Sequence, residues 1–460
     1  MSKENAARIA YCIRISGTLV LQTPLLIGAG DTSGNSQLDM HVLKDKNEEP
    51  FIPGTSLAGV LRSLVSQWEN PAAADFLFGH TEDKTGQALQ SAICINDVEL
   101  KNAQITVRDG VSIDPYTQIA KKGAKYDYEV VERGASGPFE LLVTLRQQVV
   151  DDLPNWQMLV QRIAGQLVSG IRIGALTAKG LGRVVLTKAK MATYDFTNFA
   201  DVQAWLCHQE PATQKEISGK DILPADAFSI DASFALKTSL LVRSGDVEQE
   251  KAATEGGKNT EITIPLKSGS DYLIPGTTVK GVLRHQAAYI LGILDKPSGV
   301  LDTLMGYAKD KKNGQQQLGQ KSRFLTDEVY IKPEEVNEAK QTRNAIDRFT
   351  GSTMDSKLFA EKPLWQKNKK IPTVHIHYTI EKCQDWEAGL ALFLLKDLWT
   401  GHVALGGDKA VGRGYLQGLS ATIRYQQKEG LKEWQLTKNG QVTKGDAKTL
   451  EAYAAALQNL

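Results

Sequence analysis

The sequence predicts an α+β protein made of two tandem ferredoxin-like domains, because one order of strands and helices occurs twice along the chain. The segment IPGTSLAGVLR at 52–62 returns as IPGTTVKGVLR at 274–284, with eight identities in eleven positions and an offset of 222 residues. Further matches keep the same order at nearly the same offset: 23–31 with 238–246, 77–79 with 304–306, 113–117 with 346–350, Trp156 with Trp386, and 174–182 with 406–414. A repeat of this length indicates two homologous domains rather than a solenoid of short repeats.

The junction between the two copies lies in a polar stretch of the chain. Residues 208–228 contain Pro211 and Pro224 and show little apolar periodicity, as expected of a linker. We therefore predict a first domain at 1–215, a linker at 216–227 and a second domain at 228–460.

Within each domain the expected order is strand, helix, strands, helix, strand. In the first copy, residues 13–22 and 139–146 alternate and are rich in β-branched side chains, which predicts half-buried strands. A second helix is expected from Trp156 through Leu167, followed by a glycine-rich loop and a strand at 182–188. This order is typical of a split βαβ core with insertions.

The first helix of each domain follows the sequence IPGT. Gly54 and Gly276 are expected to open it, with Thr55 and Thr277 as candidate N-caps. Apolar residues then recur at helical spacing on one face. These are Leu57, Val60, Leu61, Leu64, Val65 and Trp68 in the first copy, and Val279, Val282, Leu283, Ala287, Ile290 and Leu291 in the second.

The composition is that of an ordinary soluble globular protein. Of the 460 residues, 54 are Lys or Arg and 53 are Asp or Glu, for a net charge of +1. If such a chain binds nucleic acid, its cations must be clustered. Apolar runs are too short to span a membrane, and the N-terminus lacks the features of a signal peptide. The four cysteines form no CxxC pair, which favours a reducing cytoplasm over a zinc site.

Two histidines, His375 and His377, alternate with apolar residues in VHIHYTI, so they are expected on one face of a strand. No third ligand is evident nearby, and a surface role is favoured over a metal site.

Two repeated features could bind an anionic ligand. The glycine-rich loops could offer backbone amides and nearby cations to phosphate; the alternative is a turn that needs glycine only for close packing. They lack the spacing of an ATP-binding loop and follow a helix instead of a strand, which argues against both common nucleotide motifs. Likewise, the helix after IPGT could bind phosphate at its N-terminus, or the motif could simply start the helix.

Together, the strand ending in Gly-Asp, the IPG[ST]xxxGxxR segment, the central Ile-Asp segment and the glycine-rich loop resemble the RAMP superfamily, the RNA-binding subunits of CRISPR effector complexes. The pattern covers nearly the whole chain twice. It is most similar to the backbone subunit of type III complexes, here as a fusion of two such subunits like those of type III-D effectors. The resemblance implies a modified RNA-recognition fold in a cytoplasmic protein.

The implied partners are a CRISPR guide RNA, single-stranded target RNA and other effector subunits, with no membrane. Guide RNA would run along the first helix and the glycine-rich loop of each domain. Thumb-like hairpins at 113–131 and 346–364 would enter the guide–target duplex, with an aromatic ring for stacking and cations for phosphates. The implied RNA-binding residues are Gly54, Thr55, Ser56, Arg62, Tyr116, Lys121, Lys122, Gly174, Lys179, Gly180, Gly182, Arg183, Thr277, Thr278, Lys280, Arg284, Arg348, Phe349, Gly406, Lys409, Gly412, Arg413 and Gly414.

The resemblance also implies cleavage of target RNA by a carboxylate about 14 residues before the proline of IPG. That residue is Asp39 in the first domain, and His41 could assist it. The same count gives Glu261 in the second domain. The implied reaction is attack by a ribose 2′-hydroxyl, with Mg²⁺ or another divalent cation held by Asp39. Asp31 and Asp246 are rival candidates, for which we favour a turn role.

Two other functions remain open at this stage. One is a guide-binding scaffold with the same fold and no cleavage activity. The other is an unrelated nucleotide-dependent enzyme that uses the glycine-rich loops, which would bind mononucleotides as an isolated protein.

Overall fold

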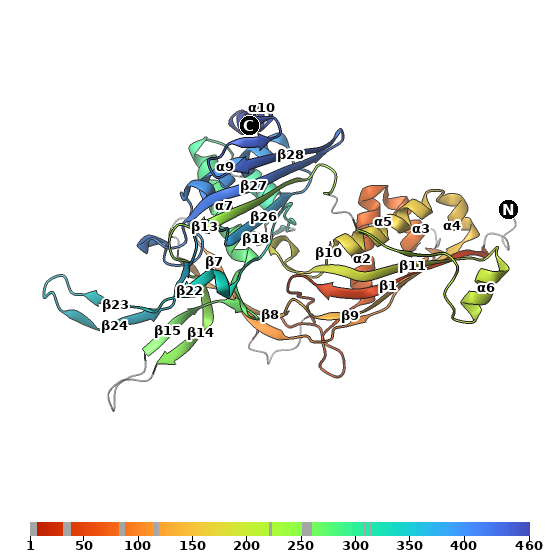
Figure 1. Cartoon of the computed structure of the whole chain (residues 1–460), viewed down its shortest axis with the longest axis horizontal. Coiled ribbons are helices and arrows are strands. Elements are labelled where there is room, and N and C mark those ends of the chain that lie inside the picture. Colours follow the sequence, from red (N-terminus) through yellow and green to blue (C-terminus); the bar gives the residue numbers. More distant parts are fainter. Residues whose placement is uncertain are drawn as a thin grey trace. The chain divides into compact units, whose positions relative to one another are not determined.

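The computed structural model describes residues 7–30, 38–81, 88–114, 117, 119–219, 223–250, 260–297, 299–307, 310–312, 315–317 and 319–460. The chain forms two compact units (Figure 1). Unit 1 comprises Met1–Gly110, Lys125–Thr177 and Leu181–Ile222, and unit 2 comprises Val111–Ala124, Ala178–Gly180 and Leu223–Leu460. Each unit contains one main sheet and its own hydrophobic core.

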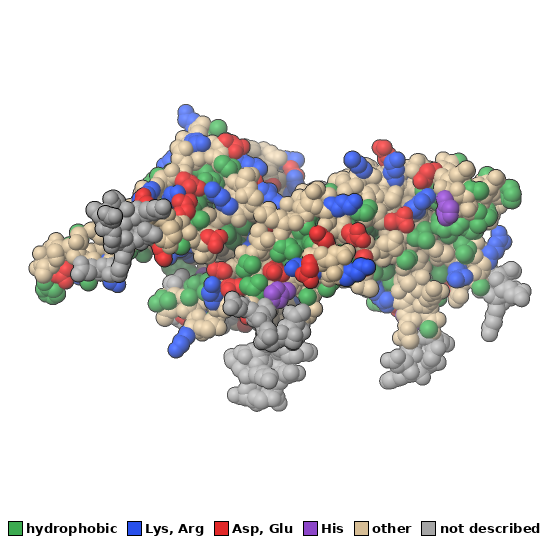
Figure 2. All heavy atoms as spheres, turned by 90° about the horizontal axis from the view of Figure 1, so that it is seen from below, with side chains coloured by type: hydrophobic (Ala, Val, Ile, Leu, Met, Phe, Trp, Pro, Cys, Tyr) green, Lys and Arg blue, Asp and Glu red, His purple; other side chains and the backbone are tan. Residues whose placement is uncertain are grey.

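Charged side chains of opposite sign are interspersed on the face of the molecule that Figure 2 shows. Lys and Arg side chains lie among Asp and Glu side chains there, and no single-sign region dominates the view. On this face, therefore, charges of both signs are mixed and largely offset one another.

The main sheet of unit 1 is built on four strands, and each neighbouring pair of them is antiparallel. Strands β1 (Ile9–Leu21), β5 (Ile93–Ile95), β9 (Ser136–Arg146) and β11 (Arg183–Asp195) lie in the order β11-β1-β9-β5. The short strands β10 (Ile171–Arg172) and β12 (Gln214–Glu216) pair with β11. The predicted strands at 13–22, 139–146 and 182–188 are confirmed.

Helices α2 (Gly54–Trp68) and α5 (Trp156–Ser169) cover one face of this sheet (Figure 1). Leu57, Leu61 and Val65 are fully buried, as their helical spacing predicts. The N-cap predictions for Thr55 and Thr277 are both wrong, because the N-cap residues are Pro53 and Pro275 and neither side chain makes a capping bond. Instead, the Gly54 amide donates to Asp97 Oδ1 at 2.7 Å. The other helices of this unit are α3 (Pro71–Phe78), α4 (Gln147–Asp152) and α6 (Phe199–Leu206).

The main sheet of unit 2 repeats the same order of strands. It consists of β13 (Phe228–Leu236), β20 (Phe324–Thr326), β26 (Val374–Ile380) and β27 (Leu416–Gln427), in the order β20-β26-β13-β27. Strands β28 (Gly430–Thr437) and β29 (Val442–Lys444) extend it beyond β27. Its helices are α7 (Gly276–Ile293), α8 (Gly299–Met305), α9 (Asp385–Thr400) and α10 (Ala447–Gln458).

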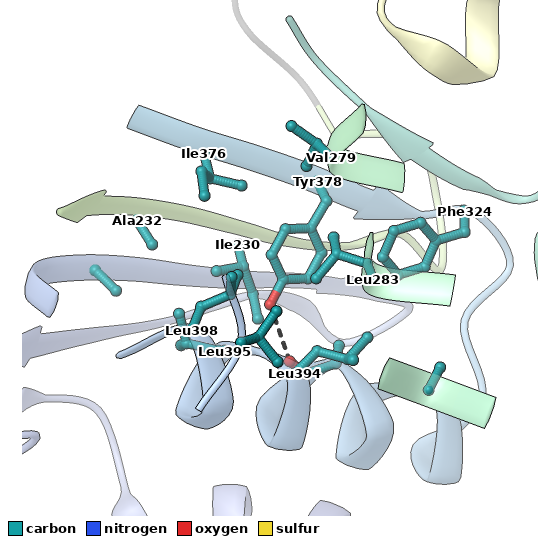
Figure 3. Packing of buried hydrophobic residues seen from close by; sticks show 14 of the residues in the cluster. Ile230, Ala232, Val279, Leu283, Phe324, Ile376, Tyr378, Leu394, Leu395 and Leu398 are labelled. Carbon is teal, nitrogen blue, oxygen red and sulfur yellow. Dashed lines mark hydrogen bonds between the residues drawn. The ribbon is translucent and has the colours of Figure 1, made fainter. Parts of the chain in front are cut away.

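The core of unit 2 centres on Tyr378, which is packed among apolar side chains (Figure 3). Its ring stacks on Phe324 with centroids 5.4 Å apart. The buried hydroxyl donates to the Ala391 carbonyl at 2.9 Å, so no polar atom of this side chain is left without a partner. Burial raises the pKa of Tyr378. On the same strand, His375 and His377 lie on the opposite face, as predicted.

The chain also carries two long β-hairpins. One consists of β7 (Ile105–Ile113) and β8 (Ala120–Val131). The other, β23 (Gln341–Ile346) with β24 (Thr353–Glu361), joins β14 (Arg243–Glu250) and β15 (Thr260–Pro265) in a sheet of order β14-β15-β24-β23. The remaining short elements are β2 (Phe51–Ile52), β3 (His80–Thr81), β4 (Ala88–Leu89), β6 (Val98–Glu99), β16 (Lys267–Ser268), β17 (Asp271–Ile274), β18 (Asp310–Lys312), β19 (Gln315–Gln317), β21 (Val329–Ile331), β22 (Val336–Glu338), β25 (Leu364–Gln366) and the 3₁₀ turns Thr177–Lys179, Pro333–Glu335 and Lys409–Val411.

Candidate functional site

The two glycine-rich loops are attached to their units by the same backbone hydrogen bonds. In unit 1 the Gly182 amide donates to the Pro24 carbonyl at 2.7 Å, and in unit 2 the Gly414 amide donates to the Ser239 carbonyl at 2.7 Å. The Gly412 amide is also engaged, with the Lys409 carbonyl at 3.0 Å. These three amides are therefore used by the fold itself.

Four of the loop glycines are required by close backbone packing. Gly174, Gly182, Gly406 and Gly414 all have φ between 78° and 82°, a region that L-residues rarely adopt. A Cβ at Gly414 would overlap with the Leu405 carbonyl oxygen, and one at Gly182 with the Ile173 carbonyl oxygen. Gly412 also has a positive φ of 87°, but no atom lies near its Cβ position.

This contrast gives a stability prediction. Gly412→Ala should destabilise unit 2 by about 1–2 kcal/mol, the usual cost of a left-handed L-residue. Gly414→Ala should cost more, about 2 kcal/mol or more beyond that value, because steric overlap with Leu405 adds to the backbone strain. Urea unfolding of both variants checks the order, and equal losses would show that the overlap is relieved.

The repeated arginines after IPGT hold a helix end in both units. Arg62 Nη1 donates to the Gly79 carbonyl at 2.6 Å, and its Nη2 pairs with Asp75 on α3. In unit 2, Arg284 makes the equivalent bonds to the Gly306 carbonyl at 2.8 Å and to Asp302. Both guanidinium groups thus fix the C-terminus of the following helix.

Lys280, the cation specific to the second copy, is buried with 7% of its surface exposed. Its ammonium donates to the Phe324 carbonyl at 2.8 Å, and burial lowers its pKa to about 7. Burial also lowers the pKa of Lys179 and Lys409 in the glycine-rich loops. Arg183 lies half-buried, and its Nη2 donates to the Ser169 carbonyl at 3.3 Å. The helix-start residues Ser56, Thr277 and Thr278 are half-buried, whereas Thr55 is exposed.

The hairpin residues are the most accessible of the predicted RNA-binding set. Phe349 is 98% exposed at the tip of the β23–β24 hairpin. Asp347 accepts hydrogen bonds from the Phe349 and Thr350 amides at 2.9 and 2.8 Å, which orders the turn. These bonds lower the pKa of Asp347. Arg348, Lys121 and Lys122 are also exposed, whereas Tyr116 lies outside the described residues.

Asp39 lies beside strand β8, on a face that carries several ionisable side chains. Its amide donates to the Asp127 carbonyl at 3.1 Å, and the Asp127 amide donates to Asp39 Oδ2 at 2.9 Å. Met40 forms a parallel bridge with Tyr128, whose ring is buried. Because side chains alternate along a strand, Asp39 and Asp127 share the face opposite Tyr128. The Asp39 carboxylate is exposed and fixed by a backbone hydrogen bond.

Further charged groups lie on the same face. Lys125 Nζ is 3.3 Å from Asp109 Oδ2 and 3.5 Å from Asp127 Oδ1. His41 Nδ1 is 3.4 Å from Glu129 Oε2, which also accepts from the Val42 amide at 3.0 Å. We call Asp39, His41, Asp109, Lys125, Asp127 and Glu129 the ionic face. The alternation of ionisable residues in KYDYE at 125–129 is the sequence signal that indicates this face.

Unit 2 places a different residue at the position of Asp39. The Leu43 amide donates to the Ile27 carbonyl, and the equivalent bond in unit 2 runs from Leu266 to Val242. The two donors, Leu43 and Leu266, are 223 residues apart, and the same offset pairs Asp39 with Ile262. Counting back from the proline gave Glu261, because the intervening hairpin is one residue shorter in unit 2. Ile262 is 4% exposed, whereas Glu261 is exposed and lies 3.4 Å from the Gln249 amide nitrogen.

The rest of the ionic face is also replaced in unit 2. The bridges Leu25–Val131 and Leu240–Leu364 set an offset of 233 along β8 and β24. With these two offsets, the six residues of the ionic face correspond to Ile262, Ile264, Thr342, Leu358, Ala360 and Lys362. Of the rival aspartates, Asp246 is exposed on β14, with its amide 3.2 Å from Ser244 Oγ, and Asp31 lies outside the described residues.

In the described part of the chain, no three or more His, Cys, Asp or Glu side chains are grouped so as to hold a metal ion. A single exposed carboxylate such as Asp39 still suits Mg²⁺, which often takes one or two carboxylates and completes its shell with water and substrate phosphates. No described helix is long and apolar enough to cross a membrane.

Comparison with known proteins identifies the family. The RAMP superfamily matches residues 18–185 and 233–417. The chain is 27% identical over 208 residues to the CRISPR system Cms endoribonuclease Csm3 of Streptococcus thermophilus, covering 41% of this chain and 92% of that protein. It is 40% identical over 86 residues to the protein of the same name from Mycobacterium tuberculosis, covering 15% of this chain and 36% of that protein. Because the two family matches span well over half of the sequence, the chain belongs to the RAMP superfamily and contains two RAMP regions in tandem.

Proposed function

We propose that this chain is a double backbone subunit of a type III CRISPR effector complex, resembling type III-D effectors. In this proposal it binds guide RNA and single-stranded target RNA together with other effector subunits in the cytoplasm, and unit 1 cuts the target. The similarity to Csm3 endoribonucleases supports the class of activity. The observation that carries the proposal is the exposed Asp39 carboxylate, which the Asp127 amide holds beside strand β8 at the position that the family resemblance implies.

Each unit is proposed to have a ferredoxin-like core of the modified RNA-recognition type. The order β11-β1-β9-β5 in unit 1 and its counterpart β27-β13-β26-β20 in unit 2 support this, since the outer strands flank a central pair and all neighbours are antiparallel. The hairpins then serve as thumbs, with Phe349 held fully exposed for stacking on a base.

The cleavage proposed for unit 1 is a transesterification. The Asp39 carboxylate accepts the proton of a ribose 2′-hydroxyl, the 2′-oxygen bonds to the adjacent phosphorus, and the bond to the 5′-oxygen breaks. The leaving 5′-oxygen takes a proton from solvent, which leaves a 2′,3′-cyclic phosphate. Mg²⁺ or another divalent cation, held by Asp39, would supply charge neutralisation at the phosphate. His41 is assigned no proton-transfer step, because its ring is paired with Glu129.

Unit 2 fits the scaffold alternative better than the cleavage proposal. Ile262 occupies the Asp39 position, and an alkyl side chain can neither accept a proton nor bind a cation. We therefore propose that unit 2 binds RNA without cutting it, and that Glu261 has no catalytic role.

The proposal is tested on the complex purified with its companion subunits from the native host. We expect co-purified small RNA of uniform length, and cleavage of complementary labelled RNA in Mg²⁺ that stops in EDTA. Each copy of the chain should contribute one cut. The absence of bound RNA would overturn the guide-binding role, and two cuts per copy would overturn the assignment of unit 2 as a scaffold. Saturable mononucleotide binding by the isolated chain would favour the nucleotide-dependent enzyme instead.

A further inference from the structure

The ionic face of unit 1 presents an electrostatic problem for an RNA-cleaving site. It holds four carboxylates, Asp39, Asp109, Asp127 and Glu129, and the proposed reaction brings a phosphodiester to Asp39. Like charges repel strongly at short range, so a scissile phosphate needs a compensating cation close to Asp39. Among the described ion pairs of this face, Lys125 supplies an ammonium group, which would act beside the divalent cation proposed above.

Lys125 is held at a defined place by two carboxylates. Its ammonium lies between Asp109 and Asp127, and the same Asp127 fixes Asp39 through its backbone amide. Asp127 Oδ1 is buried and makes no hydrogen bond within the described part of the chain, so the ammonium 3.5 Å away is its electrostatic partner. The Lys125 side chain is nevertheless 62% exposed, which leaves it accessible to a ligand.

We propose that Lys125 is a catalytic residue of unit 1 that binds the scissile phosphate, and that Asp127 is a positioning residue that fixes both Lys125 and Asp39. This inference rests on the function proposed above. Lys125 donates no proton in the reaction; its charge stabilises the negative charge that builds up on the phosphate oxygens when the 2′-oxygen attacks. Hydrogen bonding and charge interaction with Asp109 raise the pKa of Lys125, so the ammonium stays protonated at neutral pH.

The second unit provides an independent comparison within the same chain. Where Asp39 is replaced by Ile262, Lys125 is replaced by Leu358 and Asp127 by Ala360. The hairpin itself is retained, since the turn residues Asp114 and Asp347 accept equivalent hydrogen bonds from Thr117 and Thr350. A lysine needed only for the hairpin fold would be expected in both copies. The lysine is absent from unit 2, where the carboxylate is also absent, and this links Lys125 to the cleavage reaction.

The test compares Lys125→Met, Lys125→Arg and Lys190→Met in the assembled, guide-loaded complex. Lys190 is also exposed, but it lies on β11 of the main sheet and is assigned no contact with RNA. Under single-turnover conditions with saturating complex, Lys125→Met should slow cleavage by about 10²-fold, the effect of removing one stabilising donor. Lys125→Arg should recover most of the rate because it keeps the charge. Lys190→Met should leave both the target affinity and the saturated rate unchanged.

A Lys125→Met complex that cuts at the wild-type rate would overturn the proposal, as would a defect that saturating complex removes. If wild-type complex does not cut at all, the proposed function fails instead, so the two failures are distinguishable. Thermal melting of each variant separates loss of folding from loss of rate, and a destabilised Lys125→Met protein is replaced by Lys125→Gln, for which the same loss of rate is expected.

Discussion

Asp39→Asn should reduce target cleavage by about 10³-fold while guide and target binding persist. The asparagine side chain keeps an oxygen that can accept the Asp127 amide proton, so the side chain stays in place. What is lost is the negative charge, and with it the ability to accept the 2′-hydroxyl proton or bind a divalent cation. The effect is therefore chemical, and structural change is not expected.

Labelled target RNA and a gel of the products measure this effect, with filter binding as the control for affinity. The matched control is Glu261→Gln, which should leave every product unchanged because Glu261 does not occupy the equivalent position. Asp246→Asn should behave in the same way. Persistence of all cuts in Asp39→Asn would contradict the assignment of Asp39. Loss of a cut in Asp246→Asn or Asp31→Asn would move the site to the start of the preceding loop.

The parts of the fold that depend on local pattern could be predicted from sequence. Strands β1 and β9 alternate, and α2 and α5 bury residues at helical spacing, so periodicity was sufficient to find them. The tandem arrangement followed from the repeated motifs. Asp39 could be selected because the resemblance places a carboxylate at that distance from IPG.

The parts of the fold and of the site that depend on contacts between residues distant in the sequence could not be predicted. Thr55 suits an N-cap, but the first helical amide, that of Gly54, already donates to Asp97, 43 residues after Gly54. Lys280 is separated by 44 residues from Phe324, whose carbonyl accepts a hydrogen bond from its ammonium group. Asp39 and Asp127 are 88 residues apart, so their pairing, and with it the ionic face, appears only in the folded unit. A one-residue difference in hairpin length was enough to misplace the counterpart of Asp39.

Glu361→Ala should destabilise unit 2 by about 3–5 kcal/mol, the cost of removing one partner from a buried ion cluster. Glu361 is 4% exposed; its Oε1 lies 3.2 Å from Arg243, and its Oε2 lies 2.9 Å from Arg413 and also contacts Arg343. Asp408 is the second carboxylate, 2.9 Å from Arg243. Burial opposes ionisation of Asp408, but the surrounding guanidinium groups of Arg243, Arg413 and Arg343 outweigh that effect and lower its pKa. Loss of Glu361 leaves three guanidinium groups facing one carboxylate.

Chemical denaturation of the full chain measures this loss, and Glu248→Ala is the matched control. Glu248 also pairs with a cation of the same sheet, Lys362, but its side chain is 48% exposed. Such a pair should contribute no more than about 1 kcal/mol. Similar losses in the two variants would contradict a buried, coupled cluster.

Arg413→Leu provides the decisive comparison, because unit 1 has Leu181 at the corresponding position. Arg413 is 3% exposed, its Nη1 has no hydrogen-bond partner in the described part of the chain, and burial lowers its pKa. Removing it leaves two guanidinium groups and two carboxylates and relieves an unsatisfied buried donor. Its cost should therefore be clearly smaller than that of Glu361→Ala, although both variants break the same 2.9 Å contact. If both variants lose the same free energy of unfolding, the Arg413–Glu361 contact itself stabilises unit 2. If Glu361→Ala loses more, as we expect, the loss comes from buried guanidinium charge that no carboxylate compensates.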